Sequence, residues 1–319
     1  MGVRRTCSRF AVACVFSGAA VPCATADSLA PADGIQPAAS ATSALAPPAP
    51  YSLPWLLRPA VPATVVRVDE TSAFYDDPAS GRSGSTNVTS LIASYKLGPH
   101  WAPLARVSFV KNDAPVGASG HGFSNPVLGI NYFHPLRDGW RWTALLASSL
   151  PIGSGGGDTP DVGAAAAMPA GATARSAMDN TLYAVNYWGL VGGLGLSRIA
   201  RQLTLQAETT VFQLTRVRGA VSQDKTRTNL TAALHVGHFF GPRLSLGAEL
   251  RMQRWLTDAA PVRANAKARE QLTFAVGPRL QLKAGDHLIR PGVSYTRAFD
   301  DPMAARSYGI VQLDVPVVF

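Results

Sequence analysis

The end of the chain, from Arg306 to Phe319, alternates between apolar and polar positions. One parity carries Val311, Leu313, Val315 and Val317, and the other carries Gln312, Asp314 and Pro316. Only a β-strand, whose side chains point alternately to two faces, separates these sets. An apolar outer face, a polar inner face and a terminal aromatic residue are typical of the closing strand of a transmembrane β-barrel. We therefore expect the preceding chain to supply the other strands.

Alternation of this kind recurs after Pro62 in segments long enough for a tilted membrane strand of about 9 to 11 residues. We predict about twelve strands, at residues 64–75, 87–97, 101–111, 124–134, 139–150, 182–198, 202–217, 228–240, 243–256, 269–283, 287–298 and 307–319. A soluble β-sandwich would show the same alternation, because its apolar faces pair inside the protein. The alternation alone does not separate the two architectures.

The lengths of the connections do separate them. Tight links at residues 98–100, 135–138, 200–201, 241–242 and 285–286 alternate with longer links at 76–86, 112–123, 151–181, 218–227, 257–268 and 299–306. Outer-membrane barrels have short periplasmic turns, long external loops and an even strand number. The sequence therefore predicts an all-β fold, a transmembrane antiparallel up-and-down barrel over residues 64–319. Aromatic residues near strand ends fit the girdles of such barrels: Trp101, Tyr132, Trp140, Trp142, Tyr187, Phe239, Phe240 and Phe319.

The N-terminal region has the features of a secretory signal peptide. Arg4 and Arg5 precede an apolar run, and Ala24-Thr25-Ala26 is a small-x-small cleavage site, so we predict a signal peptide over residues 1–26. A lipoprotein attached through Cys23 is the alternative, which Pro22 disfavours. All three cysteines, at positions 7, 14 and 23, lie in this segment, so the mature chain is expected to contain neither a disulfide nor a thiolate metal site.

Residues 27–63 are rich in proline, alanine and serine, a composition that cannot bury a core, and we predict a disordered leader there. Within it, the segment from Trp55 to Pro59 is more apolar than its surroundings. Two alternatives follow for this part: a linker or interfacial anchor, or a small plug in the mouth of the barrel.

Charge does not indicate nucleic-acid binding. The chain has 29 Lys and Arg residues against 20 Asp and Glu, a net charge of +9, but the basic residues are dispersed over the strands. The alternation of side chains along each predicted strand instead indicates that most charges face the lumen. The candidate pore-lining residues are Arg106, Arg175, Asp179, Glu208, Arg216, Arg243, Glu249, Arg251, Arg279, Arg290 and Asp314. They would either neutralise one another in a salt-bridged interior or, through excess arginine, favour anionic or aromatic solutes.

The longest loop, residues 151–181, contains a glycine run and an alanine-rich stretch. No Gly-Lys-Ser/Thr follows the glycines and no helix-opening pattern is evident, so a phosphate-binding loop is not predicted. One interpretation folds the loop into the lumen, with Arg175 and Asp179 forming a charged constriction. The other leaves an external loop in which these two residues pair in solvent.

Candidate catalytic and metal sites are weak. His121, Ser124 and Asn125 resemble the His-x-Ser-Asn arrangement of outer-membrane phospholipase A, but the spacing is longer by one residue and the flanking residues differ. The six histidines are scattered, and His235 and His238 should face opposite sides of one strand. We predict no enzyme activity, no cofactor and no metal, and keep a lipid esterase as the least favoured alternative.

Three further motifs lie at strand ends: Ser94-Tyr95-Lys96-Leu97, Gly122-Phe123-Ser124-Asn125-Pro126-Val127-Leu128-Gly129 and Leu150-Pro151-Ile152-Gly153-Ser154-Gly155. They resemble motifs of Gram-negative outer-membrane barrels described as transporters of the phenol meta-pathway degradation type. The Gly-x-Gly-Asp motif of such barrels is Gly-Phe-Ser-Asn here, and no solute-binding residue can be transferred. The resemblance implies passage of small, including aromatic, compounds.

The sequence therefore predicts an outer-membrane barrel for passive passage of small aromatic or anionic solutes. The expected partners are outer-membrane lipid, the solute and the barrel-assembly machinery, which would bind the C-terminal strand ending at Phe319. The alternative is a lumen-filled structural barrel without transport.

Overall fold

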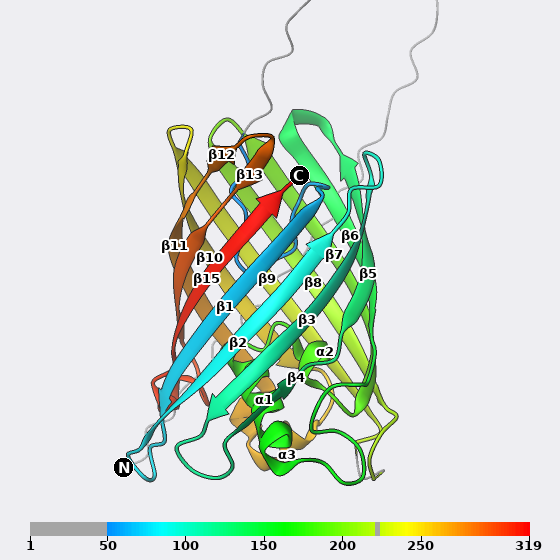
Figure 1. Ribbon diagram of the computed structural model, residues 1–319, viewed down its shortest axis with the longest axis vertical. Helices are drawn as coiled ribbons and strands as arrows, with labels where there is room; N and C mark the ends of the chain where they lie inside the picture. The colour runs from blue at the N-terminus through cyan, green and yellow to red at the C-terminus, as the bar shows by residue number, and fades with distance from the viewer. Residues whose placement is uncertain (1–49, 221–223) are drawn as a thin grey trace, which may run out of the picture. The chain divides into compact units, whose positions relative to one another are not determined.

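The computed structural model describes residues 50–220 and 224–319, so the predicted signal peptide and most of the predicted leader lie outside the described residues. The described chain forms an antiparallel sheet that closes on itself (Figure 1), because β1 (Val65–Asp76) pairs with both β2 (Ser83–Ser94) and β15 (Gly309–Val318). The remaining wall strands are β3 (Trp101–Asp113), β4 (Gly120–Phe123), β5 (Val127–Pro135), β6 (Trp140–Ser149), β7 (Tyr187–Ala200), β8 (Leu203–Arg216), β9 (Thr226–Phe240), β10 (Leu244–Trp255), β11 (Glu270–Leu280) and β14 (Gly292–Ala298).

Within the described residues the ring has twelve strands. Strands β4 and β5 pair with successive parts of β3 and count as one wall strand. Two short strands, β12 (Leu282–Ala284) and β13 (His287–Ile289), form a hairpin that extends the wall beyond β11 and β14. The predicted all-β, twelve-stranded barrel is confirmed.

Some predicted boundaries are wrong. The strand predicted over residues 182–198 begins only at Tyr187, because residues 180–183 form the short helix α2 (Asn180–Tyr183). The strand predicted over 124–134 begins earlier, as β4, and is interrupted at residues 124–126, where Asn125 instead binds the long loop.

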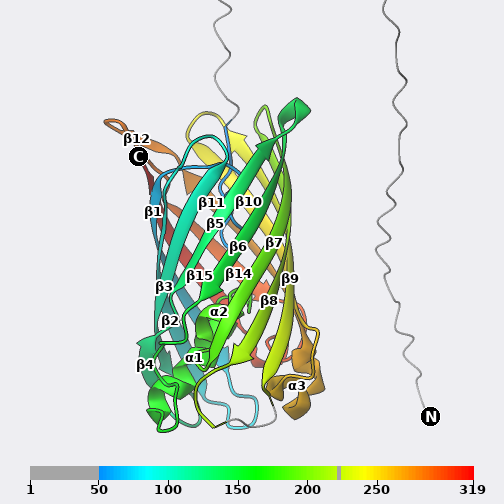
Figure 2. The same cartoon turned by 90° about the vertical axis from the view of Figure 1, so that its right-hand side faces the viewer.

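The long loop after β6 contains a helix that the sequence analysis did not predict, α1 (Val162–Ala174). The side chain of Asp161 accepts a hydrogen bond from the backbone N–H of Ala164 and caps the helix, and the alanine-rich composition favours its interior. In Figures 1 and 2 it lies inside the end of the barrel that carries the long loops. The other helices are α3 (Ala260–Ala264) and the 3₁₀ turns η1 (Arg137–Gly139), η2 (Ala266–Arg269) and η3 (Ala304–Arg306). No described helix is long and apolar enough to cross a membrane.

The alternating pattern places apolar residues outside and polar residues inside. On β10, Leu246 and Leu250 are exposed on the outer surface, whereas Glu249 and Arg251 are buried in the interior. The single closed sheet excludes the β-sandwich, because no second sheet covers these leucines within the described chain.

The connections divide the barrel into a short-turn end and a long-loop end. The turns before β3, β6, β8 and β10 are tight, and the loops containing α1 and α3 lie together at the opposite end (Figure 2). Most predicted girdle residues are on the outer surface near strand ends, including Trp101, Trp140 and Phe240. Tyr187 and Phe239 are exceptions, because their side chains are buried inside the barrel.

Candidate functional site: the barrel lumen

The lumen is entered by residues 50–62, which we call the plug. Tyr51, Leu53, Trp55 and Leu57 are all buried inside the barrel. Tyr51 packs near Ile199 at the short-turn end, while Leu57 contacts Met178 of the long loop. Trp55 to Pro59, for which the sequence allowed an anchor or a plug, lie inside the lumen.

Two wall carboxylates bind backbone N–H groups of the plug. Glu249 accepts hydrogen bonds from Trp55 and from Leu56, the latter at 3.3 Å. Glu208 accepts from the N–H of Arg58 at 3.0 Å and pairs with its guanidinium at 3.1 Å. Because unpaired backbone groups are costly to bury, these carboxylates fix the path of a segment that has no regular secondary structure.

Wall side chains also donate to the plug carbonyl oxygens. Arg290 donates to the carbonyl of Tyr51 at 3.0 Å, and Gln206 donates to that of Arg58 at 2.6 Å. The guanidinium of Arg279 lies 4.3 Å from the centroid of the Trp55 ring, a cation–π contact. The plug is thus bound by strands far from it in the sequence.

Glycines on the inner wall provide the space for the plug. A Cβ atom at Gly237 would lie 2.1 Å from Oγ of Ser52, and one at Gly193 would lie 2.6 Å from the guanidinium of Arg58. At Gly292 a Cβ atom would lie 2.6 Å from the ring of Trp55. A side chain at Gly237 or Gly292 would collide with the plug at Ser52 or Trp55, and one at Gly193 would move the guanidinium of Arg58.

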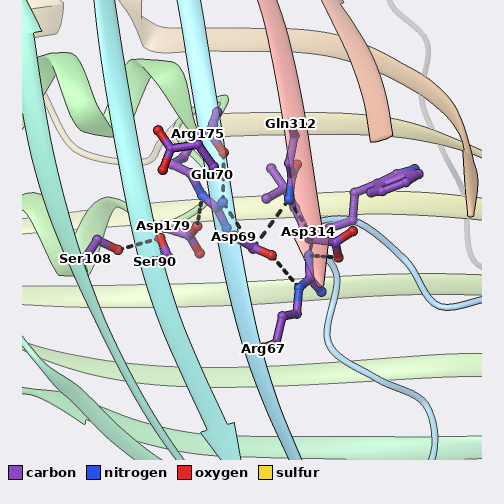
Figure 3. Close-up of polar contacts among 12 residues, drawn as sticks. Arg67, Asp69, Glu70, Ser90, Ser108, Arg175, Asp179, Gln312 and Asp314 are labelled. Atoms are coloured by element: carbon purple, nitrogen blue, oxygen red, sulfur yellow. Dashed lines mark hydrogen bonds and ion pairs between the residues drawn. The ribbon is translucent and has the colours of Figure 1, made fainter. Parts of the chain in front are cut away.

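A chain of alternating charges links the long loop to the wall (Figure 3). Its ion pairs are Arg106–Asp179 at 2.5 Å, Arg175–Asp179 at 3.2 Å, Arg175–Asp69 at 3.3 Å, Arg67–Asp69 at 2.6 Å, Arg67–Asp314 at 2.9 Å and Arg279–Asp314 at 2.9 Å. Asp69, which also lies near the amide of Gln312, is fully buried. Burial would raise the pKa of Asp179, but the guanidinium groups of Arg106 and Arg175 hold it below its usual value. This chain of ion pairs fixes the long loop to β1 and β3.

The long loop lies in the lumen, which is one of the two positions predicted for it. Arg175 is 1% exposed and Asp179 is 8% exposed, so the loop lies in the lumen and not in external solvent. The two residues contact each other, as the constriction hypothesis requires, but each also binds a wall residue. Asn125 holds the base of the loop, accepting a hydrogen bond from Gly153 and donating to the carbonyl of Ala184.

Most of the candidate pore-lining residues face the interior, with one exception. Arg243 is exposed in the turn before β10, because the strand begins one residue later. Arg216 lies inside, at the long-loop end, beside Tyr187. Arg67 and Asp69 also face the lumen and were not among the predicted pore-lining residues, although the alternation along β1 places both on the inner face.

Inward side chains divide the lumen into two walls. The polar wall, from β9 through β15 to β1, carries Asn229, Thr231, His235, Glu249, Arg251, Gln253, Gln271, Thr273, Arg279, Ser294, Thr296, Gln312, Asp314, Arg67, Asp69 and Thr71. The apolar wall, formed by β3, β5, β6 and β7, carries Ala102, Leu104, Val127, Phe133, Leu145, Ala147 and Val191. Arg106 is its charged exception, and its buried polar side chains include Ser108, Asn131, Thr143 and Ser197. Strand β8 lies next to β7 and adds Phe212.

A cavity of about 170 Å³ lies where the plug and the long loop approach each other. The apolar wall lines most of one side, and Arg67 and Thr231 of the polar wall also line it. Leu56 and Leu57 of the plug line it, together with Met178 and Leu182 of the loop. Its charged lining residues are Arg58, Arg67, Arg106, Arg175, Asp179, Glu208 and Arg290. An apolar cavity of about 150 Å³ is large enough for a benzene molecule, so this one is large enough for a single aromatic ring.

The residues of the esterase alternative do not come together. His121 is exposed on the outer face of β4 and packs against Phe109. Ser124 is buried, and its Oγ accepts a hydrogen bond from the N–H of Ser108. A serine nucleophile requires a base within hydrogen-bond reach, and His121 does not supply it. His235 is buried while His238 is exposed, so these histidines face opposite sides, as predicted.

A closed twelve-stranded sheet with an apolar exterior and a charged interior is the fold of an outer-membrane β-barrel. The crystal structure of an outer-membrane channel from Pseudomonas putida F1 is similar, with a TM-score of 0.55 and 13% identity, covering 84% of this chain and 97% of that one. The KdgM porin has a TM-score of 0.45 and 10% identity, covering 80% of this chain and 99% of its own. No protein-family model and no curated protein matches the sequence. The likeness to the Pseudomonas putida channel confirms the barrel fold.

Proposed function

We propose that the protein lies in the outer membrane and allows passive passage of small solutes that carry an aromatic ring and an anionic or hydroxyl group. The observation that supports this proposal is the cavity along the apolar wall. Its apolar side chains would contact the ring, while Arg58 or Arg106 would meet a carboxylate or hydroxyl group at the margin. The resemblance to barrels of the phenol meta-pathway type is in accord with such a solute.

Passage requires the plug to move. The cavity is bounded by Tyr51, Trp55 and Leu57, so a solute entering from the long-loop end would meet the plug before it reached the short-turn end. Because the plug is not part of the sheet, its displacement breaks contacts with the wall and with the long loop, and the pairing of β1 with β15 stays intact. The proposed route runs along the apolar wall.

A lumen-filled structural barrel is the second candidate, and the ion-pair chain supports it. Buried networks of this kind stiffen a barrel interior, and Arg175 fixes the loop to the wall through Asp69. In this alternative the plug and loop never leave the lumen.

Uptake by proteoliposomes tests the two candidates against each other. The purified protein would be reconstituted, and entry of 4-hydroxybenzoate, which is ionised at neutral pH, would be compared with that into protein-free liposomes. Passage predicts uptake that depends on the protein and saturates with the solute. Uptake equal to that of empty liposomes would favour the structural barrel.

A further inference from the structure

The outer face of the barrel carries one charged side chain far from any strand end among the described residues. Glu70 points outward and is the sixth of the 12 residues of β1. The other outward charges lie within two residues of a strand end: Asp76, Lys111, Asp113, Arg198, Arg254, Glu270 and Arg297. Glu70 therefore lies near the middle of the wall, where an outer-membrane barrel faces hydrocarbon.

Glu70 has apolar outward neighbours on its own strand and on β15. Val68 and Phe74, outward on the same strand, are 47% and 55% exposed, and Leu313, directly across on β15, is 51% exposed. An ionisable group at such a position is costly in contact with lipid, and it usually marks a functional contact. A protein partner that supplies hydrogen bonds would remove this cost.

Glu70 belongs to a polar patch shared by β1 and β2, which we define as Glu70, Ser72, Asn87 and Thr89. The hydroxyl of Thr89 donates to Oε2 of Glu70 at 2.5 Å, and that of Ser72 donates to Oδ1 of Asn87 at 2.8 Å. Within residues 50–220 and 224–319, Oε1 of Glu70 and the amide nitrogen of Asn87 have no hydrogen-bond partner. The patch thus presents both an acceptor and a donor.

The opposite side of the barrel differs. On β7, β9 and β10, the outward side chains in mid-strand include Leu194, Leu234 and Leu250, which lipid alone can solvate. On β8, the outward hydroxyl of Thr209 donates to the backbone carbonyl of Thr231, so it needs no further partner. The carboxylate of Glu70 and the amide of Asn87 need hydrogen-bond partners that lipid tails do not supply.

We infer that the polar patch is the centre of a contact between two copies of this chain. In one membrane, a two-fold axis along the membrane normal places equivalent residues of two copies at the same depth, so the patch meets itself. The carboxylate of Glu70 then accepts from the Asn87 amide of the second copy, and the reverse bond forms by symmetry. Val68, Phe74, Leu91 and Leu313 supply an apolar rim. The inference rests on the proposed membrane location but not on solute passage.

Disulfide crosslinking in isolated outer membranes tests this contact. Because the three cysteines of the chain lie in the predicted signal peptide, Thr89→Cys introduces a single thiol at the patch. Mild oxidation should give a reducible band of double mass, whereas the matched variant Leu194→Cys should stay monomeric. Monomer from both variants, or equal crosslinking of both, would overturn the inference. Membrane fractionation of the same samples reports the location separately.

Substitution of Glu70 distinguishes a second copy from lipid. Loss of the charged hydrogen bond should lower the crosslinked fraction of Thr89→Cys about tenfold in the Glu70→Leu background, and Glu70→Gln, which keeps an acceptor oxygen, should lower it less. If the patch instead faces lipid, Glu70→Leu removes a costly carboxylate, raises thermal stability and leaves crosslinking unchanged, and that outcome refutes the contact.

Discussion

The two walls of the lumen differ in chemistry and in what they contact. The polar wall carries the carboxylates and guanidinium groups that bind Trp55 of the plug and Arg175 of the loop. The apolar wall has few such groups and borders the cavity. Hydrogen bonds and ion pairs depend on direction and so fix one arrangement of their partners. Apolar contacts are non-directional and can accommodate partners of different shape. The difference suggests that one wall closes the barrel and the other accommodates a solute.

Asp69→Asn should have the largest effect on stability, because it weakens the centre of the ion-pair chain. Arg67 and Arg175 would each lose a buried anionic partner, at a cost of about 3 kcal/mol. The gel migration of the folded barrel after heating measures the unfolding midpoint. Asp113→Asn, at an exposed strand end, is the control and should leave the midpoint unchanged. Equal unfolding midpoints for both variants would mean that the ion-pair chain does not stabilise the polar wall.

Gly193→Leu should open the lumen. The new side chain would occupy the space of the Arg58 guanidinium, whereas the outward neighbour Gly192 has no atom within 4 Å of a Cβ position. Single-channel recordings in planar bilayers should show several-fold larger or more frequent steps for Gly193→Leu, and wild-type behaviour for Gly192→Leu. Identical recordings would argue that the plug does not close the barrel.

Phe212→Ser tests the apolar wall. Loss of the ring contact should lower the saturable uptake of 4-hydroxybenzoate about tenfold and leave uptake of xylose unchanged. Val211→Ser, on the outer face of the same strand, is the matched control and should preserve both rates. If both solutes slow equally in Phe212→Ser, the cavity has no preference for an aromatic ring.

The smallest effect is expected at Arg243. Although parity predicted a pore-lining role, the side chain is exposed in a turn, so Arg243→Ala should change stability by less than about 0.5 kcal/mol. Arg279→Ala, which removes a buried partner of Asp314 and the cation above Trp55, should destabilise the barrel clearly in the same heating assay. An equal loss of stability in both variants would show that burial in the lumen does not determine how much these arginines stabilise the barrel.

The strands could be predicted from the sequence because period-two alternation is local. Glu249 and Arg251 were assigned to the interior from their neighbours alone, and the same parity in β1 would have found Arg67 and Asp69. The cap of α1 at Asp161 was also visible in the sequence and was overlooked.

The plug could not be predicted in the same way. Its proline and alanine content indicates disorder, and its order depends on contacts with distant residues, such as that between Trp55 and Glu249, 194 positions apart. The sequence does not show which strand glycines leave space for the plug, because Gly193 and Gly237 contact it only in the closed barrel. The pairing of loop and wall through Arg175 and Asp69 is equally non-local.

The most direct test of two walls with different roles is the ratio of 4-hydroxybenzoate to xylose uptake in proteoliposomes, measured for wild type, Gly193→Leu and Phe212→Ser. We expect Gly193→Leu to raise the uptake of both solutes, because it displaces the plug. Phe212→Ser should lower the ratio, because it removes a contact that only the aromatic solute makes. A ratio that is the same in all three proteins would contradict the assignment of solute passage to the apolar wall.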